Sequence, residues 1–239
     1  MDRILNKELL RSATIPAIFV AVLFAMKLVE VLFDISLARL GVLPRNLMGL
    51  SGILTYPLIH GDWKHLFNNS VAIFVLGTMV YHFYREFAGR ALLWMLLLSG
   101  LWLWIGGRPN YHIGASGMVY ALFGFLFLSG ILRRHMKLMA LSLLVVFLYG
   151  SLVWGIFPME EHISWEGHLF GLLAGLGVAL SYRGRGAQRP SYSWDLPGGE
   201  EIPEWYTIEQ EQLKSKQENS FQIHYEFKSK DDKNEKQSD

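Results

Sequence analysis

The chain of 239 residues contains no cysteine, which excludes disulfide bonds, thiolate nucleophiles and cysteine-ligated metals. It also lacks the His-Glu-x-x-His pattern with which a helix binds the zinc ion of a metalloprotease. Charge is scarce as well, because residues 91–106, 113–132 and 138–157 contain no Asp, Glu, Lys or Arg. We therefore expect no metal and no other cofactor, in a chain that is apolar over long stretches.

These charge-free segments have about the length of a membrane-spanning helix. Hydrophobic residues make up 51% of the chain, and a helix needs about 20 mostly apolar residues to cross the hydrocarbon of a bilayer. Three further apolar segments contain only isolated polar residues. The sequence therefore predicts an all-α membrane protein, with six transmembrane helices in a domain at residues 14–182 that is embedded in the lipid bilayer. The predicted spans are 15–33, 66–83, 91–106, 113–132, 138–157 and 168–182.

The distribution of basic residues predicts the orientation in the membrane. Cytoplasmic segments of membrane proteins carry an excess of Lys and Arg. If residues 1–13 are cytoplasmic, the predicted outer segments contain only Arg39, Arg45, Lys64 and Arg108. We therefore expect both termini in the cytoplasm and the protein in the cell (inner) membrane. The net charge of +1 gives no sign of a nucleic-acid partner, and we expect none.

The first apolar segment has a second interpretation, because Ser36-Leu37-Ala38 resembles the cleavage site of a signal peptide. The apolar stretch is long for a signal peptide, however, and Lys27 and Glu30 interrupt it. We therefore interpret it as a retained membrane anchor. Lys27 and Glu30 are three residues apart and are predicted to form an internal ion pair.

Two segments outside the spans have unusual compositions. The long first loop, Leu37 to Gly61, is rich in apolar residues and is predicted to lie partly in the membrane interface. After Tyr182 the sequence becomes rich in Glu, Lys, Gln and Ser, and we predict that residues 183–239 form a charged, disordered cytoplasmic tail. Residues 202–213 contain aromatic side chains and have a second interpretation, as a segment that docks on the membrane surface or on a partner; we favour a solvated tail.

Ser116 lies within Gly114-Ala115-Ser116-Gly117, at the start of a charge-free span. Small residues also allow membrane helices to pack closely, so the motif alone fits a packing role equally well. A helix N-terminus, however, presents free amide donors and the positive end of the helix dipole, which suits an oxyanion. This position makes Ser116 a candidate nucleophile.

His168 is the only ionisable residue of the last predicted span. An isolated buried histidine is commonly structural, yet an ionisable side chain within a membrane is by default a functional hypothesis. At 100° per residue, Gly171 and Gly175 lie on the same helix face as His168. The two glycines predict that this face meets another helix closely.

The partner face is predicted in the fourth span, where Ser116 and Tyr120 share a face with Gly117 and Gly124 beside it. Two glycine-bearing faces, one with a hydroxyl and one with an imidazole, are suited to close contact. Contact between them would bring Ser116 and His168 together as a serine–histidine dyad.

Polar residues also gather at the start of the second span. His65 and Asn69 are four residues apart and therefore share a helix face, whereas His60 is predicted to precede the helix. A polar cap that satisfies loop carbonyls explains His60 as well as a catalytic role does. For Asn69, deeper in the span, we favour a hydrogen-bonding role in the site.

Three motifs thus follow one another: His60-x4-His65-x3-Asn69, then Gly114-Ala115-Ser116-Gly117 with Tyr120 and Gly124, then Gly167-His168-x2-Gly171-x3-Gly175. Their order, their spacing and the six-span plan resemble the rhomboid family of intramembrane serine proteases, over about residues 45 to 182. The resemblance implies that Ser116 is the nucleophile and His168 its base, without an acidic third member. It also implies that His65 and Asn69 stabilise the oxyanion and that Tyr120 supports the histidine.

The function implied by this resemblance is endopeptidase cleavage of transmembrane segments through an acyl-enzyme. The substrates would be single-span membrane proteins whose helix unwinds easily near its outer end. One departure concerns the first loop, where the family usually carries a Trp-Arg pair and this chain has Arg45 alone.

Two other classes of function are compatible with a helical membrane protein. A catalytically silent member of the fold, which binds membrane proteins for quality control or trafficking, is the main alternative, and the presence of both Ser116 and His168 argues against it. A transporter of small solutes is disfavoured because the sequence shows neither a charged pathway nor an inverted repeat.

Overall fold

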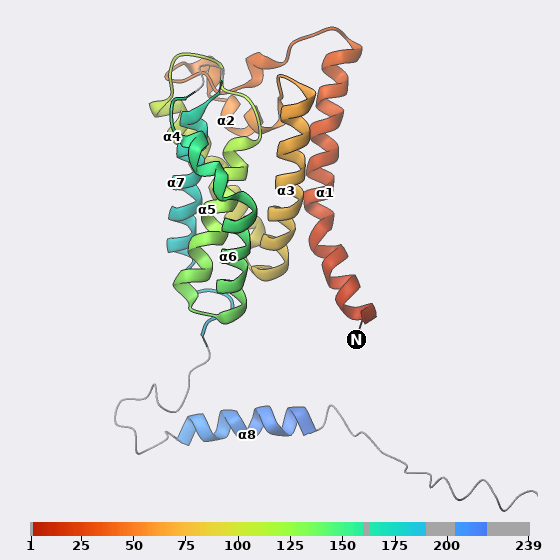
Figure 1. The fold of residues 1–239 in the computed structure, drawn as a ribbon, viewed down its shortest axis with the longest axis vertical. Coiled ribbons are helices and arrows are strands. Elements are labelled where there is room, and N and C mark those ends of the chain that lie inside the picture. The colour runs from red at the N-terminus through yellow and green to blue at the C-terminus, as the bar shows by residue number, and fades with distance from the viewer. Residues whose placement is uncertain (1, 160–162, 190–203, 219–239) are drawn as a thin grey trace, which may run out of the picture. The chain divides into compact units, whose positions relative to one another are not determined.

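The computed structural model describes residues 2–159, 163–189 and 204–218, and every regular element in these ranges is a helix (Figure 1). The chain forms two compact units, residues 1–189 and 190–239. The α-helices of the first unit are α1 (Asp2–Leu32), α2 (Gly52–Thr55), α3 (Trp63–Phe83), α4 (Ala88–Gly106), α5 (Ser116–Arg133), α6 (Met136–Tyr149) and α7 (Trp165–Ser181). Its 3-10 helices are η1 (Ala38–Leu40), η2 (Leu47–Gly49), η3 (Tyr56–Leu58) and η4 (Gly150–Ile156). The second unit contains α8 (Glu204–Glu218).

The long helices of the first unit have the composition of membrane spans. In the described part of the chain, five segments are long and apolar enough to cross a bilayer: Lys7–Leu32, Trp63–Phe83, Ala88–Gly106, Ser116–Arg133 and Met136–Ile156. Many of their large apolar side chains are exposed, including Leu143 at 72% and Phe147 at 85% on α6. Such a surface is unfavourable in water and favourable in lipid, so the protein is an integral membrane protein. The last apolar helix, α7, is shorter, with 17 residues.

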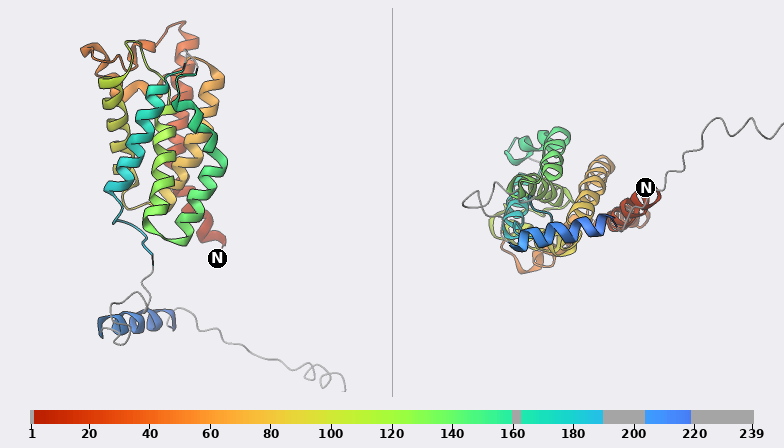
Figure 2. Two further views of the ribbon diagram at one scale, coloured as in Figure 1. Left: turned by 60° about the vertical axis from the view of Figure 1, so that its left-hand side comes forward. Right: turned by 90° about the horizontal axis from the view of Figure 1, so that it is seen from below.

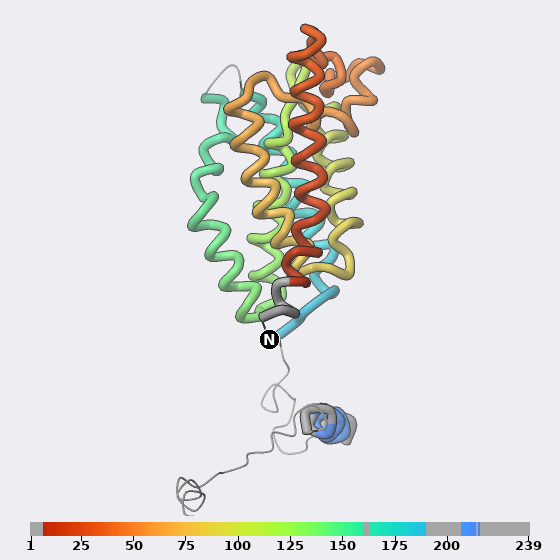
Figure 3. Tube along the Cα trace, turned by 90° about the vertical axis from the view of Figure 1, so that its right-hand side faces the viewer, coloured from red at the N-terminus to blue at the C-terminus, as the bar shows by residue number. Residues whose placement is uncertain are grey.

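Helix α5 forms the centre of the bundle and packs against α3, α6 and α7. Helix α1 lies on the outside, against α3 (Figures 1 and 3). The view along the bundle in Figure 2 shows α1 at its edge. The core therefore consists mainly of the apolar side chains of α3, α4 and α5, among them Leu66, Leu76, Met95 and Phe125.

The contact between α5 and α7 is as close as their glycines predict. A Cβ atom on Gly171 would overlap the carbonyl oxygen of Gly117, and one on Gly175 would overlap that of Ala121. On α5, a Cβ atom on Gly124 would lie 2.9 Å from the carbonyl oxygen of Leu172. The backbones of α5 and α7 can approach each other this closely only because these glycines have no side chains.

At the other end of α5, a buried arginine fastens the end of α7. Arg133 is 2% exposed and donates hydrogen bonds to the carbonyl oxygens of Tyr182 and Arg185, at 2.7 and 3.0 Å. Its guanidinium also lies 5.0 Å from the ring centroid of Tyr84. Because these bonds involve residues after α7, the first unit extends to Arg189, beyond the predicted boundary at residue 182.

The predicted disorder of residues 183–239 is wrong for the stretch that forms α8. Helix α8 consists largely of Glu, Gln, Lys and Leu, which are strong helix formers. In its middle the side chains are solvent-exposed, with Ile208 at 47% and Leu213 at 52%. The rest of the predicted disordered segment after Arg189, residues 190–203 and 219–239, lies outside the described residues.

Candidate active site

Ser116 is the first residue of α5, and the chain reaches it through a tight turn. Gly114 adopts a φ of +108°, a conformation that L-residues with a side chain rarely adopt. The amide of Gly114 donates a hydrogen bond to the carbonyl oxygen of Tyr56 at 2.9 Å. Gly114 was predicted to be one of the glycines at helix contacts. In the structure it lies in the turn that leads into Ser116. The hydroxyl of Ser116 lies at the helix N-terminus, where the first amides point outward.

The structure brings Ser116 and His168 into direct contact. The Nε2 atom of His168 lies 2.8 Å from the Oγ atom of Ser116. His168 lies in the first turn of α7, whose N-terminus is capped by the Ser164 hydroxyl, which accepts a hydrogen bond from the amide of Gly167 at 3.2 Å. The close approach of α5 and α7 therefore places the hydroxyl and the imidazole within hydrogen-bond distance.

The other ring nitrogen of His168 contacts the main chain of η4. Its Nδ1 atom lies 2.8 Å from the carbonyl oxygen of Gly155. A carbonyl oxygen can only accept, so Nδ1 carries the proton in the neutral ring and Nε2 is free to accept from the Ser116 hydroxyl. Tyr120 lies flat on the imidazole, with ring centroids 4.3 Å apart and 9° between the ring planes. The sequence pattern did not indicate Gly155.

His60 and Asn69 form a second polar pair beside Ser116. The Nε2 atom of His60 lies 3.2 Å from Nδ2 of Asn69 and accepts a hydrogen bond from the amide of Ala115 at 3.2 Å. His60 is 2% exposed; burial, together with the charge on nearby His65, lowers the pKa of His60 to about 4. The ring is therefore neutral near pH 7, and it holds both Asn69 and the residue before Ser116 in place.

His65 contacts the turn that leads into Ser116. Its ring packs against Gly114, where a Cβ atom would lie 2.9 Å from Cε1 of His65. It also meets the ring of His60 edge-on, with centroids 5.4 Å apart. Asp62 caps α3 just before it, and its side chain accepts a hydrogen bond from the amide of His65 at 2.8 Å. That bond is the main reason why the pKa of Asp62 is lowered.

Most of the predicted site residues, though not His60, line one cavity of about 620 Å³. Ser116, His168, Tyr120, His65 and Asn69 all contribute to its wall. Asp62, Lys64 and Asn68 line it as well, which gives the cavity a polar side that can hold water. The predicted site residues are thus close together in space, although the chain carries them on α3, α5 and α7.

Comparison with known proteins identifies the family of the chain. The sequence model of the Rhomboid domain matches residues 47–185. The chain belongs to the rhomboid family. Uncharacterized proteins of Mycobacterium tuberculosis (strain H37Rv) and Mycobacterium bovis are each 33% identical to it, across 67% of this chain and 71% of their own length. An uncharacterized protein of Mycobacterium leprae is 31% identical, across 67% of each chain.

The first loop of this rhomboid domain is anchored although it lacks the expected Trp-Arg pair. Arg45 donates a hydrogen bond to the carbonyl oxygen of Gly107 at 3.0 Å, and Nε1 of Trp104, on α4, donates to that of Asn46 at 3.0 Å. Val42 and His112 exchange two backbone hydrogen bonds, of 2.8 and 2.9 Å. Anchoring in this rhomboid domain therefore uses a tryptophan from α4, outside the loop.

The sequence motifs did not reveal a polar cluster whose members His112 and Ser164 also line the cavity. His112 bonds the Ser164 hydroxyl through Nδ1 at 2.6 Å and the carbonyl oxygen of Arg108 through Nε2 at 3.0 Å. Burial lowers the pKa of His112. Arg108 also lies 2.8 Å from Glu166, which is 3% exposed. Because Ser164 caps α7, the cluster fixes the turn that carries His168.

The predicted ion pair in the first span is present, with Nζ of Lys27 3.2 Å from Glu30. Lys27 also donates to the carbonyl oxygens of His60 and Gly61, at 2.9 and 3.0 Å. Glu30 accepts a hydrogen bond from the amide of Leu37 at 2.8 Å. The pair therefore joins the end of α1 to both ends of the first loop and takes no part in the cavity wall.

Proposed function

We propose that this rhomboid-family protein is a serine endopeptidase that cleaves transmembrane segments of membrane proteins. The observation that carries the proposal is the 2.8 Å contact between Oγ of Ser116 and Nε2 of His168, in a cavity of about 620 Å³. A nucleophile in hydrogen-bond contact with its base, which is oriented by a third group, is the arrangement of an activated serine.

In the proposed mechanism, Nε2 of His168 takes the hydroxyl proton while Oγ of Ser116 forms a bond to the carbonyl carbon of the peptide. The tetrahedral intermediate collapses, the carbon–nitrogen bond breaks, and His168 returns its proton to the leaving amine. Water then attacks the acyl-enzyme and gives a proton to Nε2 of His168. His168 passes this proton to Oγ of Ser116 as the ester bond breaks and the new carboxyl end leaves. No cofactor enters this sequence of steps.

Three donors are proposed to stabilise the oxyanion. They are the amide of Ser116 at the N-terminus of α5, the side-chain amide of Asn69 and the ring of His65. Asn69 is held by His60 at 3.2 Å and His65 packs against Gly114, so both are fixed before the substrate arrives. One preorganised donor of this kind typically contributes about 3 kcal/mol to the stability of the transition state.

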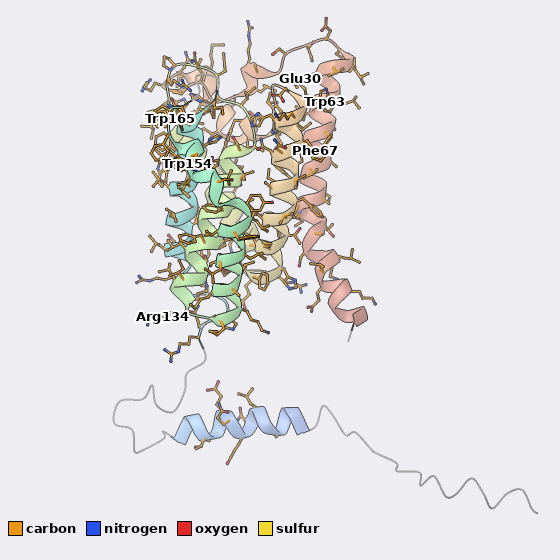
Figure 4. The ribbon with its side chains drawn as sticks, viewed as in Figure 1. Glu30, Trp63, Phe67, Arg134, Trp154 and Trp165 are labelled. Atoms are coloured by element: carbon orange, nitrogen blue, oxygen red, sulfur yellow. The ribbon has the colours of Figure 1, made fainter. Side chains whose placement is uncertain are left out.

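The proposed topology has six spans, with α7 as the sixth. At about 1.5 Å per residue, its 17 residues cover roughly 26 Å, which is slightly less than the hydrocarbon thickness. The N-terminus of α1 and Arg134 lie at one end of the first unit, and Glu30, Trp63 and Trp165 lie at the other (Figures 1 and 4). With the basic end in the cytoplasm, the cavity opens toward the outer face, and residues 1–13 and 183–239 are cytoplasmic.

A single-span protein whose helix unwinds near its outer end is the proposed substrate, because a peptide bond inside a helix is inaccessible to a nucleophile. The test uses a fluorophosphonate probe on the detergent-solubilised full-length protein. Wild-type protein should be labelled, Ser116→Ala should not, and Ser181→Ala, which removes an exposed hydroxyl on α7, should be labelled like wild type. Equal labelling of Ser116→Ala and wild type would exclude Ser116 as the nucleophile. Folded protein that resists the probe and cleaves no transmembrane substrate would favour a catalytically silent binding protein.

A further inference from the structure

The 3-10 segment η4 touches the reactive pair through two backbone carbonyl groups. The carbonyl oxygen of Leu152 accepts a hydrogen bond from Oη of Tyr120 at 2.6 Å. The carbonyl oxygen of Gly155 lies 2.8 Å from Nδ1 of His168. Since the rings of Tyr120 and His168 are stacked, η4 holds both members of the stack from one side.

Gly155 can reach the histidine only because it has no side chain. A Cβ atom at this position would overlap Oη of Tyr120 and lie 3.1 Å from Nδ1 of His168. Gly150, at the start of the same segment, differs in this respect. A Cβ atom there would meet Cγ1 of Val146 at 3.5 Å, which is an ordinary van der Waals contact.

We propose that the carbonyl group of Gly155 orients the catalytic histidine, in the position that a carboxylate occupies in a Ser-His-Asp triad. This inference rests on the proposed function. The carbonyl oxygen holds the proton on Nδ1, so that the lone pair of Nε2 faces Ser116. As His168 takes the serine proton, the bond from Nδ1 becomes charge-assisted and stronger, which favours the transition state over the ground state. Gly155 is a positioning residue, because its carbonyl group acts through His168.

This assignment links the reactive pair to α6. Helix α6 continues directly into η4 and packs mainly on α5, with most of its large side chains exposed, including Leu143 and Phe147. A displacement of α6 and η4 away from α5 would therefore remove the acceptor of His168. The position of the α6–η4 segment against Tyr120 and His168 therefore determines whether His168 is oriented to accept the proton of Ser116.

The first experiment determines which ring nitrogen of His168 carries the proton, and it does not require an active enzyme. Full-length Ser116→Ala protein with ¹⁵N-labelled histidine is examined by NMR in detergent, and the His168 signals are assigned by their loss in His168→Gln. We expect Nδ1 of neutral His168 to carry the proton. Adding Gly155→Ala should shift His168 toward the other tautomer, and adding Gly150→Ala should leave it unchanged. An unchanged His168 tautomer in Gly155→Ala, or a proton on Nε2 in the parent protein, would overturn the proposal.

The second experiment measures cleavage of a transmembrane substrate by otherwise wild-type protein. Gly155→Ala should lower kcat by about 100-fold, as expected for a small misplacement of a reacting group, with little change in KM. Gly150→Ala should keep the wild-type kcat. Tyr120→Phe removes the atom that the new Cβ overlaps, so the double variant Tyr120→Phe/Gly155→Ala should be more active than the product of the two single effects predicts.

The two proposals fail in different ways. Wild-type protein that neither reacts with the probe nor cleaves a substrate contradicts the proposed function, while the NMR experiment still tests the Nδ1 contact. Active wild-type protein together with a fully active Gly155→Ala variant contradicts the positioning role alone. Strictly additive effects in the double variant would also count against it. If Gly155→Ala folds poorly by thermal unfolding, the double variant and the parent NMR spectrum decide the question.

Discussion

His60 holds Asn69 through a hydrogen bond of 3.2 Å between Nε2 of His60 and Nδ2 of Asn69. Nε2 of His60 also accepts a hydrogen bond from the backbone amide of Ala115. A single neutral imidazole thus fixes a side chain of α3 and the backbone that leads into Ser116. His60 carries out this function only while Nε2 is unprotonated, which makes the arrangement sensitive to pH.

Stability should therefore fall as the pH falls from about 6.5 to about 4. Burial lowers the pKa of His60 to about 4, whereas a histidine in the unfolded chain has a pKa of about 6.5. Between these values the unfolded state binds more protons, so the free energy of unfolding increases with pH. Thermal unfolding in detergent across this range checks the effect. In His60→Gln the decline should be smaller, and an identical decline in that variant would assign the pH dependence to other groups.

Asn69→Ala and His65→Ala should each lower kcat by about 10- to 1000-fold with little change in KM, because their donors act on charge that develops only in the transition state. Thr78→Ala provides a control on the same helix, since Thr78 is partly exposed and its hydroxyl bonds to the backbone carbonyl of Phe74 on its own helix. A loss of thermal stability with unchanged kcat in the folded fraction would instead identify Asn69 and His65 as packing residues.

Gly171→Ala should destabilise the bundle by about 1–3 kcal/mol, the usual cost of overpacking. Its Cβ atom would overlap the carbonyl oxygen of Gly117 and push α7 away from Ser116, so the kcat of the remaining folded protein should fall as well. Gly177→Ala is the matched control, because a Cβ atom there has no neighbour within 4 Å. Equal melting temperatures for the two variants would contradict the close contact of α5 and α7.

The segment after Arg189 should be dispensable for cleavage, whereas the residues just before it should not. Truncation after Arg189 keeps the bonds from Arg133 to Tyr182 and Arg185, and kcat should stay close to wild type. Truncation after Ser181 removes two of the three carbonyl acceptors of this buried guanidinium and leaves only the one of Ser129, so it should destabilise the protein by several kcal/mol. A folded but inactive truncation after Arg189 would make residues 190–239 part of the enzyme.

Protease added to intact cells should leave the tail uncut, because the tail is proposed to lie in the cytoplasm. Digestion of the tail in intact cells would reverse the proposed orientation.

The helical part of the site could be predicted from the sequence because it follows helix periodicity. Gly171 and Gly175 share a face with His168, and that face indeed meets Gly117 and Ala121. The same reasoning could not reveal Gly155 or His112. Both act from connecting segments, and their partners His168 and Ser164 are fixed by tertiary structure and not by spacing along the chain.

The first loop and the tail show two other limits of sequence reasoning. The family's anchoring tryptophan was expected within the first loop, whereas in this chain Trp104 makes an anchoring contact from α4. In the tail, low hydrophobicity indicated disorder, but the local helix propensity of Glu204–Glu218 prevailed and α8 forms.

The most direct test of the account is the cleavage of a transmembrane substrate by purified, reconstituted protein. Wild type, Ser116→Ala, His168→Ala and the double variant are compared at equal folded concentration, with thermal unfolding measured on the same preparations. Because the serine and the histidine act as one unit, either single substitution should abolish cleavage and the double variant should be no worse. Substantial turnover by folded Ser116→Ala protein would contradict the central claim.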